Sequence, residues 1–329
     1  MHLNLTSNNT VIHLRCLTVE FKYDFAQDSS IVNTLVIILL SIAVIPTTLL
    51  NTVSVYVFSR KEIRKRIPTN ILILASCIVD LLNGSISIPT CIAHYGLIIS
   101  SRHYECPLYV IMLSAGQSIS WISAVMTLII SIDRYLAIFY PYFYESWCVN
   151  RPSLYYGLCS GTCLFSIIMV IVSFSQVGFQ PVLYLTGSVP LIVVISFYTH
   201  LRISCTVSQI KRRITQQSSA DTSNNNINNT ATVKPNKKLT RKSTVLDTRK
   251  TSSVAVFMLC LLCLCYTPYF VVILLWKIRL IETGLNPTVG QYTASSLAAV
   301  FVLYRSCFNP LIYIYTMPSV RRHKRFFKR

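Results

Sequence analysis

The sequence predicts an all-α membrane protein that folds as a bundle of seven transmembrane helices. Of its 329 residues, 53% are hydrophobic and 12% are charged, and the mean hydropathy is +0.53, a balance that soluble domains of this length rarely reach. No apolar stretch alternates with the period of two that a membrane β-strand requires, so the spans are helices that satisfy their own backbone hydrogen bonds. The stretches long enough to cross about 30 Å of hydrocarbon are residues 31–58, 69–93, 107–132, 154–179, 181–201, 253–276 and 289–316.

The distribution of lysine and arginine predicts the orientation of the chain, because short loops rich in these residues stay in the cytoplasm. The link after the first span, SRKEIRKR, contains five basic residues between Arg60 and Arg66, whereas residues 20–30 carry three acidic side chains and one lysine. We therefore expect a protein of the plasma membrane whose amino-terminal tail, residues 1–30, is extracellular. The link 202–250 and the basic tail 318–329 are then cytoplasmic, and we expect the tail to form a short amphipathic helix.

The net charge of +19 is explained by this topology, and it also attracts the protein to the anionic lipids of the inner leaflet. Such attraction is worth about 1 kcal/mol for each basic residue near the membrane surface. No zinc-ligand spacing or aromatic RNA-binding signature accompanies the charge, so nucleic acid is not an expected partner. The sequence predicts no metal site and no other cofactor.

The regions outside the spans carry candidate modifications and one loop without predicted structure. Asn4 and Asn8 begin glycosylation sequons in the outer tail, and we expect Cys16 to form a disulfide with Cys106 at the top of the third helix. The cytoplasmic residues 214–246 include TQQSSADTSNNNINNTATVKPN, a polar, Asn-rich stretch that cannot bury enough apolar surface to fold. We expect this loop to be disordered.

Three short motifs lie within the predicted helices. SIDRYLAIFYP, residues 131–141, ends the third span, CYTP, residues 265–268, lies in the sixth, and FNPLIY, residues 308–313, ends the seventh. They resemble the Asp-Arg-Tyr, Cys-Trp-x-Pro and Asn-Pro-x-x-Tyr motifs of rhodopsin-like G-protein-coupled receptors. Each motif is short, but all occur in order on their expected helices, and the resemblance extends over residues 31–325. Other positions that match the family are Asn51, Asp80, Ser123, Pro190 and Tyr198.

The resemblance implies that the protein transduces binding of an extracellular ligand to a heterotrimeric G protein, which enters a crevice opened by the sixth helix. The residue types agree, because Asp133 can hold Arg134 in a local ion pair until the helices separate and Arg134 packs against Tyr198 and Tyr313. Prolines remove helical hydrogen bonds and allow kinks, which we expect at Pro190 and Pro268. The predicted coupling and activation residues are Asp133, Arg134, Tyr135, Tyr198, Asn309, Pro310 and Tyr313.

Arg305 interrupts the apolar run LYRSCFNPLIYIY, residues 303–315. Counted from the inner ends of their helices, Arg305 and Asp80 both lie roughly 17 to 18 Å above the cytoplasmic boundary. An unpaired charge is costly at this depth, so we expect a direct ion pair; the alternative is that Arg305 extends into internal water without touching Asp80. In the family this region holds a sodium ion, which Arg305 would replace as a tethered cation. The predicted polar core is Asn51, Asp80, Ser123, Arg305 and Ser306.

Several positions depart from the family pattern. Tyr109 stands where the third helix usually has a cysteine, and Tyr266 stands where the sixth helix usually has a tryptophan. The acid that often clamps the arginine of the Asp-Arg-Tyr motif aligns with Thr248. A weaker clamp predicts appreciable activity without ligand.

The class of ligand stays open among peptide, lipid and small molecule. An amine receptor would need a carboxylate where Gly116 stands, and a light receptor would need a lysine near Leu303. Aromatic residues in the middle of a helix serve in packing as well as in ligand binding. The candidate pocket residues are Met112, Gly116, Gln117, Tyr266, Tyr269, Phe270 and Tyr292.

Other protein classes remain as alternatives. A polytopic transporter or channel could use Asp80 and Arg305 for permeation, but the two halves of the chain show no internal repeat. A membrane enzyme would need a catalytic cluster, which the sequence lacks, so we expect no enzyme activity. A receptor that never engages a G protein is disfavoured by the intact sequence from Asp133 to Tyr135.

Overall fold

The computed structural model describes residues 30–64, 68–100, 106–175, 180–225, 257, 260–275, 278 and 288–316, which are almost entirely helical and contain no strand. Six helices are long and apolar enough to cross a membrane, and Cys260–Leu275 is a shorter apolar helix. The predicted bundle of seven apolar helices is therefore confirmed. The elements are α2 (Ser30–Ser59), α3 (Lys61–Arg64), α4 (Thr69–Leu82), η1 (Asn83–Ser87), α5 (Ile88–Ser100), α6 (Cys106–Phe139), α7 (Pro141–Phe143), η2 (Tyr144–Val149), α8 (Pro152–Ser175), α9 (Gln180–Asn225) and α11 (Val289–Thr316).

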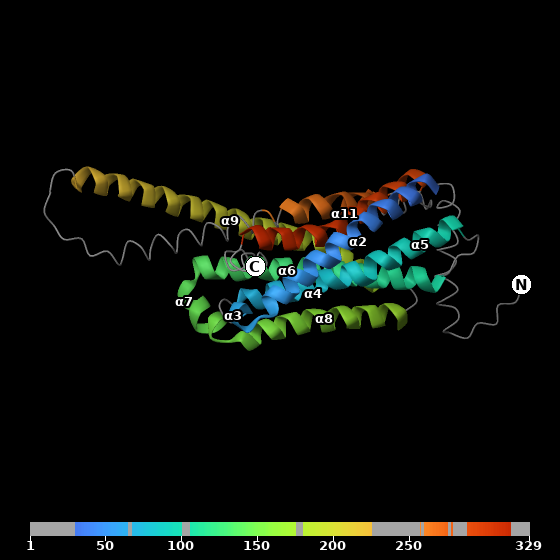
Figure 1. Ribbon diagram of the computed structural model, residues 1–329, viewed down its shortest axis with the longest axis horizontal. Helices are drawn as coiled ribbons and strands as arrows, with labels where there is room; N and C mark the ends of the chain where they lie inside the picture. Colours follow the sequence, from blue (N-terminus) through green and yellow to red (C-terminus); the bar gives the residue numbers. More distant parts are fainter. Residues whose placement is uncertain are drawn as a thin grey trace, which may run out of the picture.

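α6 is the helix around which much of the bundle is arranged. It packs against α4, α8 and α9, while α2 packs against α4, α5 and α11 (Figure 1). A buried apolar cluster joins α6 to α9 and to the helix Cys260–Leu275; its members are Ala124, Val189, Ile192, Leu262 and Tyr266. Side chains of α6 can therefore contact several helices at once.

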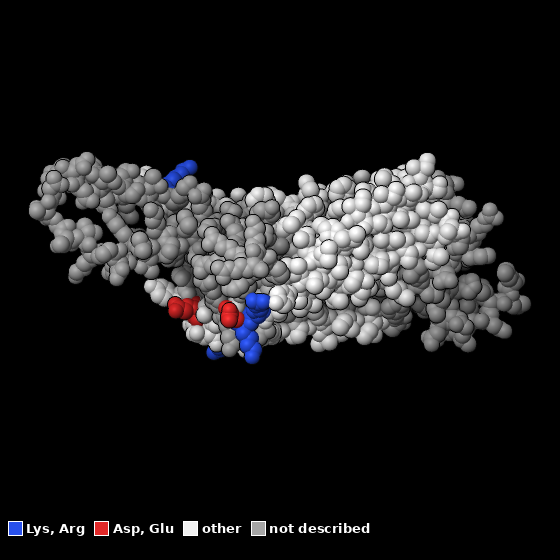
Figure 2. Space-filling view, in the orientation of Figure 1, with Lys and Arg blue, Asp and Glu red and all other residues white. Residues whose placement is uncertain are grey.

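Apolar side chains cover the outside of the bundle, and its inside holds buried polar side chains beside the apolar clusters. On α2, Ile31 and Leu49 are exposed, whereas Asn33 and Asn51 are buried. The charged side chains coloured in Figure 2 gather where α3 and α7 lie and beside α9, and the rest of the described surface on this face carries no charge. This arrangement suits helices surrounded by lipid, where polar groups are buried against other helices.

The second transmembrane span contains a π-helical turn, η1, that the sequence did not predict. A Cβ atom added to Gly84 would lie 3.0 Å from Thr47 Cγ2 and 3.0 Å from Thr48 Oγ1 of α2. The missing side chain thus allows η1 to approach α2 closely. The turn also points Asn83 toward α11, as its hydrogen bonds show below.

α9 is longer than the sequence predicted. It continues to Asn225 and projects beyond the other helices (Figure 1), so residues 215–225 of the loop expected to be disordered are helical. The segment QIKRRITQQSSAD contains no proline or glycine, and several of its residues are good helix formers, so nothing ends the helix there.

Several predictions concern residues outside the described part of the chain. These are the glycosylation of Asn4 and Asn8, the pairing of Cys16, and the amphipathic tail 318–329. Cys106 begins α6, but its side chain also lies outside the description. These predictions stay predictions.

Candidate functional site

The Asp80 carboxylate of α4 is fully buried, and donors from two other helices surround it. Ser123 of α6 and Ser306 of α11 donate to Oδ1 at 2.8 and 2.9 Å, and Asn309 Nδ2 donates to Oδ2 at 2.7 Å. Burying a carboxylate is costly unless it is hydrogen-bonded, and these three donors offset part of that cost. Asp80 therefore ties α4, α6 and α11 together.

Two asparagines hold α11 beside this carboxylate. Asn51 Nδ2 donates to the backbone carbonyl of Ser306 at 2.9 Å, and Asn83 Nδ2 donates to the Ser306 hydroxyl at 2.9 Å. The sequence predicted Asn51 but missed Asn83. An Asn-Gly dipeptide in the middle of an apolar span was the available signal for an irregular turn there.

The Arg305 side chain of α11 is 2% exposed, and hydroxyl groups of α6 receive its hydrogen bonds. Nη1 donates to Thr127 Oγ1 at 3.1 Å, and Nη2 donates to the Ser123 hydroxyl. Cζ also lies 5.5 Å from the centroid of the Tyr266 ring, a cation–π distance. Because Ser123 accepts from Arg305 and donates to Asp80, its hydroxyl connects the two charges.

The direct ion pair predicted between Arg305 and Asp80 is wrong, since the structure forms no such pair between these two described side chains. The equal depth is supported, because both side chains reach Ser123. The physical reason for the difference lies on α6, where Ser123 and Thr127 occupy successive turns. Their hydroxyls match two nitrogens of the planar guanidinium, and the Ser123 hydroxyl also binds the carboxylate.

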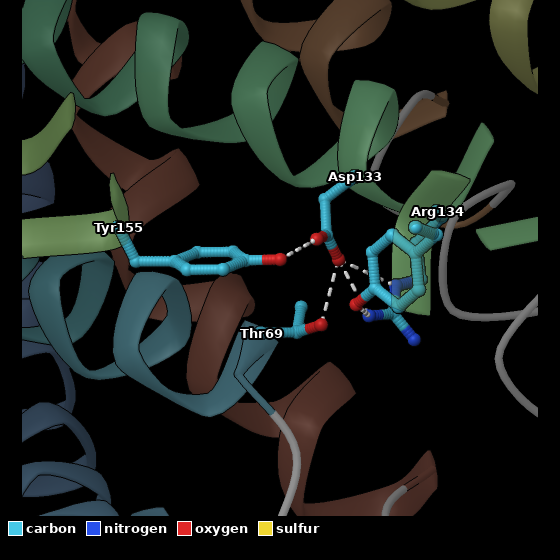
Figure 3. A network of polar contacts seen from close by, with 5 residues as sticks. Thr69, Asp133, Arg134 and Tyr155 are labelled. Carbon is cyan, nitrogen blue, oxygen red and sulfur yellow. Dashed lines mark hydrogen bonds and ion pairs between the residues drawn. The ribbon is translucent and has the colours of Figure 1, made fainter. Parts of the chain in front are cut away.

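A second charged cluster lies near the carboxyl-terminal end of α6 (Figure 3). Arg134 Nε and Nη2 donate to Asp133 Oδ2 at 3.0 and 2.5 Å, which is the local ion pair expected from the sequence. Thr69 Oγ1 of α4 donates to the same oxygen at 2.6 Å, and the Tyr155 hydroxyl of α8 donates to Oδ1 at 2.6 Å. Both carboxylate oxygens are thus occupied, and Asp133 is only 5% exposed.

η2, which lies in the segment between α6 and α8, also contacts this cluster. Arg134 Nη2 donates to the Tyr144 hydroxyl at 3.1 Å. Burial and then the Asp133 charge raise the pKa of the nearby Cys148 thiol, which favours its neutral form beside the carboxylate. The sequence did not predict Tyr144 or Tyr155, because the stretch FYPYFYESWCVNRPSLYY offers many similar tyrosines and no spacing distinguishes these two.

The other predicted switch residues make contacts different from those of this cluster. Tyr135 stacks on the aromatic ring one turn further along α6, with 4.4 Å between ring centroids. Tyr313 is buried against Phe58, with 6.2 Å between ring centroids, and Pro310 lies inside α11. Tyr198 is 55% exposed on α9. In this conformation the structure does not bring Tyr198 and Tyr313 to Arg134.

Two of the candidate pocket residues are joined directly. Gln117 Nε2 of α6 donates to the Tyr269 hydroxyl at 2.7 Å, and the Tyr266 hydroxyl donates to a backbone carbonyl of α6 at 2.7 Å. Trp121 Nε1, which the sequence did not single out, donates to Ser188 Oγ of α9 at 2.9 Å. α6 is therefore linked by polar contacts to α9 and to the helix Cys260–Leu275 in this half of the bundle.

The other candidate pocket residues are half-buried. A Cβ atom added to Gly116 would meet no atom within 4 Å, so space is open beside α6 at this position. The Tyr292 hydroxyl lies 3.5 Å from Asn33 Oδ1 of α2. Met112 and Phe270 are half-buried on α6 and on the helix Cys260–Leu275.

Comparison with known proteins identifies the family. The model of the 7 transmembrane receptor (rhodopsin family) matches residues 50–313, most of the chain, whereas a search of curated proteins gave no match. The chain therefore belongs to the rhodopsin family of seven-transmembrane receptors. It is a rhodopsin-like G-protein-coupled receptor embedded in a membrane through several helices, and members of this family are signalling receptors and not enzymes. The family assignment also decides against the transporter or channel alternative.

Proposed function

We propose that this receptor transmits binding of an extracellular ligand to a heterotrimeric G protein by releasing Arg134 from Asp133. The observation that carries the proposal is the state of Arg134, which is held by Asp133 and Tyr144 and is therefore not free for a partner. An arginine released from these contacts offers five N–H donors to backbone carbonyls of a partner helix. The resting cluster and its release are the two states that a switch requires.

The same proposal places the amino terminus outside the cell and the α3 and α7 end of the bundle in the cytoplasm. Charged side chains gather at this end on the face shown in Figure 2. Basic residues follow α2 directly, from Arg60 to Arg66. Cytoplasmic loops retain such residues, so a plasma-membrane receptor with this orientation fits the charge pattern.

We place the ligand site in the half of the bundle opposite to the charged end. The open space beside Gly116 and the nearby polar pair of Gln117 and Tyr269 offer room and hydrogen-bonding groups together. The chemistry of these side chains suits peptide, lipid and small-molecule ligands alike. Substituting Gly116 by Leu fills the space, and we expect loss of response to any agonist that a ligand screen identifies, at unchanged surface level.

We also propose that Arg305 takes the place of a mobile sodium ion at Asp80. The guanidinium shares the Ser123 hydroxyl with Asp80, so a positive charge already stands beside the buried carboxylate. We expect purified receptor to have the same thermal stability in NaCl and in KCl, whereas Arg305→Asn acquires stabilisation that is specific for sodium. A sodium-specific effect on the unmodified receptor would contradict this proposal.

Coupling is tested by expressing the receptor with a panel of G-protein dissociation sensors, without ligand, beside Arg134→Ala at equal surface level. We expect dissociation of at least one G-protein subtype, lost in Arg134→Ala. Arg60→Ala is a matched control, because Arg60 is an exposed arginine at the same end, and its Nη2 donates to the Tyr56 hydroxyl at 2.6 Å. Equal signals from the receptor and Arg134→Ala across the panel would count against coupling through Arg134.

A further inference from the structure

Three hydroxyl side chains, Ser123, Thr127 and Ser131, lie on successive turns of one face of α6, and all are buried. Thr127 Oγ1 donates to the Ser123 carbonyl at 3.0 Å, and Ser131 Oγ donates to the Thr127 carbonyl at 2.7 Å. Arg305 of α11 contacts Ser123 and Thr127. Ser131, nearest the Asp133 cluster, is contacted by a different helix.

That helix is α9, which presents His200 to Ser131. Nε2 of His200 lies 2.9 Å from Ser131 Oγ, and the imidazole is only 2% exposed. A hydroxyl has one proton, and Ser131 already donates it to the Thr127 carbonyl. The Ser131 oxygen must therefore accept from His200, which assigns the proton of the neutral imidazole to Nε2.

His200 and Tyr198 lie on opposite sides of α9. An α-helix turns by about 100° per residue, so positions two apart in sequence differ by about 200° around its axis. His200 is buried against α6, and Tyr198 is 55% exposed. As long as the bond between His200 and Ser131 is present, the inner part of α9 is held with Tyr198 outside the bundle. Bringing Tyr198 toward Arg134 requires this part of α9 to turn or shift, which separates His200 from Ser131.

The face of α9 that carries His200 is incompletely satisfied in this conformation. His200 Nδ1 and the Ser196 hydroxyl, one turn earlier, are buried and have no hydrogen-bond partner within the described part of the chain. Buried polar atoms of this kind are unfavourable and call for an explanation. The two unpartnered atoms are explained if the observed position of α9 is one of two states. In the second state, a shifted register of α9 can offer these atoms other hydrogen-bond partners.

We propose that His200 is a positioning residue of the activation switch, whose hydrogen bond to Ser131 holds α9 in the resting register with Tyr198 outside the bundle. The inference rests on the proposed coupling through Arg134, and His200 acts on Arg134 only through the position of Tyr198. Loss of one buried hydrogen bond changes an equilibrium by about two- to tenfold. His200 is therefore expected to set the basal activity without being required for coupling.

The first test measures G-protein dissociation without ligand at equal surface level. We expect His200→Leu and Ser131→Ala each to raise the signal about two- to tenfold. The signal of the double variant should not exceed that of either single variant, because both substitutions remove the same hydrogen bond. His200→Gln keeps an N–H donor at the same end of the side chain and should restore the signal of the unmodified receptor. Leu201→Ala, at a position 52% exposed on the same helix, is the control for unspecific changes in α9.

A second measurement does not depend on coupling. Purified receptor carrying 3-fluorotyrosine at position 198 reports the surroundings of that ring by fluorine NMR. We expect Ser131→Ala and His200→Leu to shift or split the resonance and His200→Gln to leave it unchanged. Ser131→Ala removes only a hydroxyl, so it keeps the test informative where His200→Leu fails to fold.

The two measurements separate failure of this inference from failure of the proposed function. Equal signals for the receptor and Arg134→Ala would remove the proposed coupling, and the fluorine resonance would then decide alone whether His200 positions Tyr198. An unchanged resonance in Ser131→Ala would overturn the inference. Where Arg134→Ala does lower the signal, the inference would equally be overturned by an unchanged or lower basal signal in both single variants, or by His200→Gln behaving like His200→Leu.

Discussion

Two sites that combine an aspartate with an arginine meet on α6, and they are built in opposite ways. In the middle of the bundle, Asp80 and Arg305 come from α4 and α11, and the Ser123 hydroxyl stands between their charges. Near the carboxyl-terminal end of α6, Asp133 and Arg134 are neighbours in sequence and touch directly at 2.5 Å, and we call them the inner pair. The middle site joins residues far apart in sequence through helix packing, whereas the inner pair joins two neighbouring residues of α6.

This difference separates what each site can respond to. Any relative movement of α4, α6 and α11 changes the contacts of Asp80, so the middle site depends on the arrangement of the bundle. The inner pair joins neighbouring residues of one helix, and the hydrogen-bond partners around it set its strength. Thr69, Tyr155 and Tyr144 come from three other elements and keep the pair in place. The comparison predicts large effects of substitutions in the middle and smaller, graded effects at the inner end.

The largest effect is expected for Arg305→Leu. The substitution leaves the fully buried Asp80 carboxylate without the positive charge that Ser123 connects to it, and leaving a buried charge uncompensated costs roughly 3–5 kcal/mol. Thermal unfolding of the purified receptor should show a correspondingly large loss of stability. Reduced surface expression should accompany it.

The control for Arg305→Leu removes the orphaned charge as well. Asp80→Asn combined with Arg305→Leu should recover part of the lost stability, because the amide carries no charge that needs compensation. A double variant that is less stable than Arg305→Leu would show that Arg305 matters for packing and not for charge. The contrast between the two sites would then lose its electrostatic basis.

A smaller effect is expected for Tyr155→Phe at the inner site. It removes one donor from Asp133, and a hydrogen bond to a charged group is worth about 1.5–3 kcal/mol. Tyr156→Phe is the matched control, because the neighbouring tyrosine is 50% exposed, and its change should stay within about 0.5 kcal/mol. Thermal unfolding of both variants checks the prediction, and equal changes would mean that Tyr155 does not hold Asp133.

The sequence predicted most of the fold and the shared level of Asp80 and Arg305, because both follow from periodic apolar spans and a fixed rise per residue. Contacts across helices were predicted less well. The Ser123 hydroxyl interrupts the expected ion pair, and which hydroxyls of α6 face α11 depends on helix rotation. Counting residues along a helix gives depth but does not give that rotation.

Local irregularities and redundant residue types explain the other misses. The π-helical turn at Asn83–Ser87 changes the direction of every later side chain in its span. Tyr155 is one of many tyrosines in its region, and the fold alone selects it for Asp133. His200 gave no signal, because a single histidine in an apolar span belongs to no motif until its partner is known.

The smallest effect is expected for Tyr144→Phe. Its hydroxyl accepts one bond from Arg134 at 3.1 Å at a half-buried position, so its loss should cost only about 0.5–1.5 kcal/mol. We expect basal G-protein dissociation to rise about twofold or somewhat more, since Arg134 then has one contact fewer in the resting state. Tyr142→Phe, at a position 89% exposed in the same segment, should leave the signal unchanged. A loss of thermal stability larger than that of Tyr155→Phe would reverse the order proposed for the inner site, because the segment after α6 and not α8 would then be its main support.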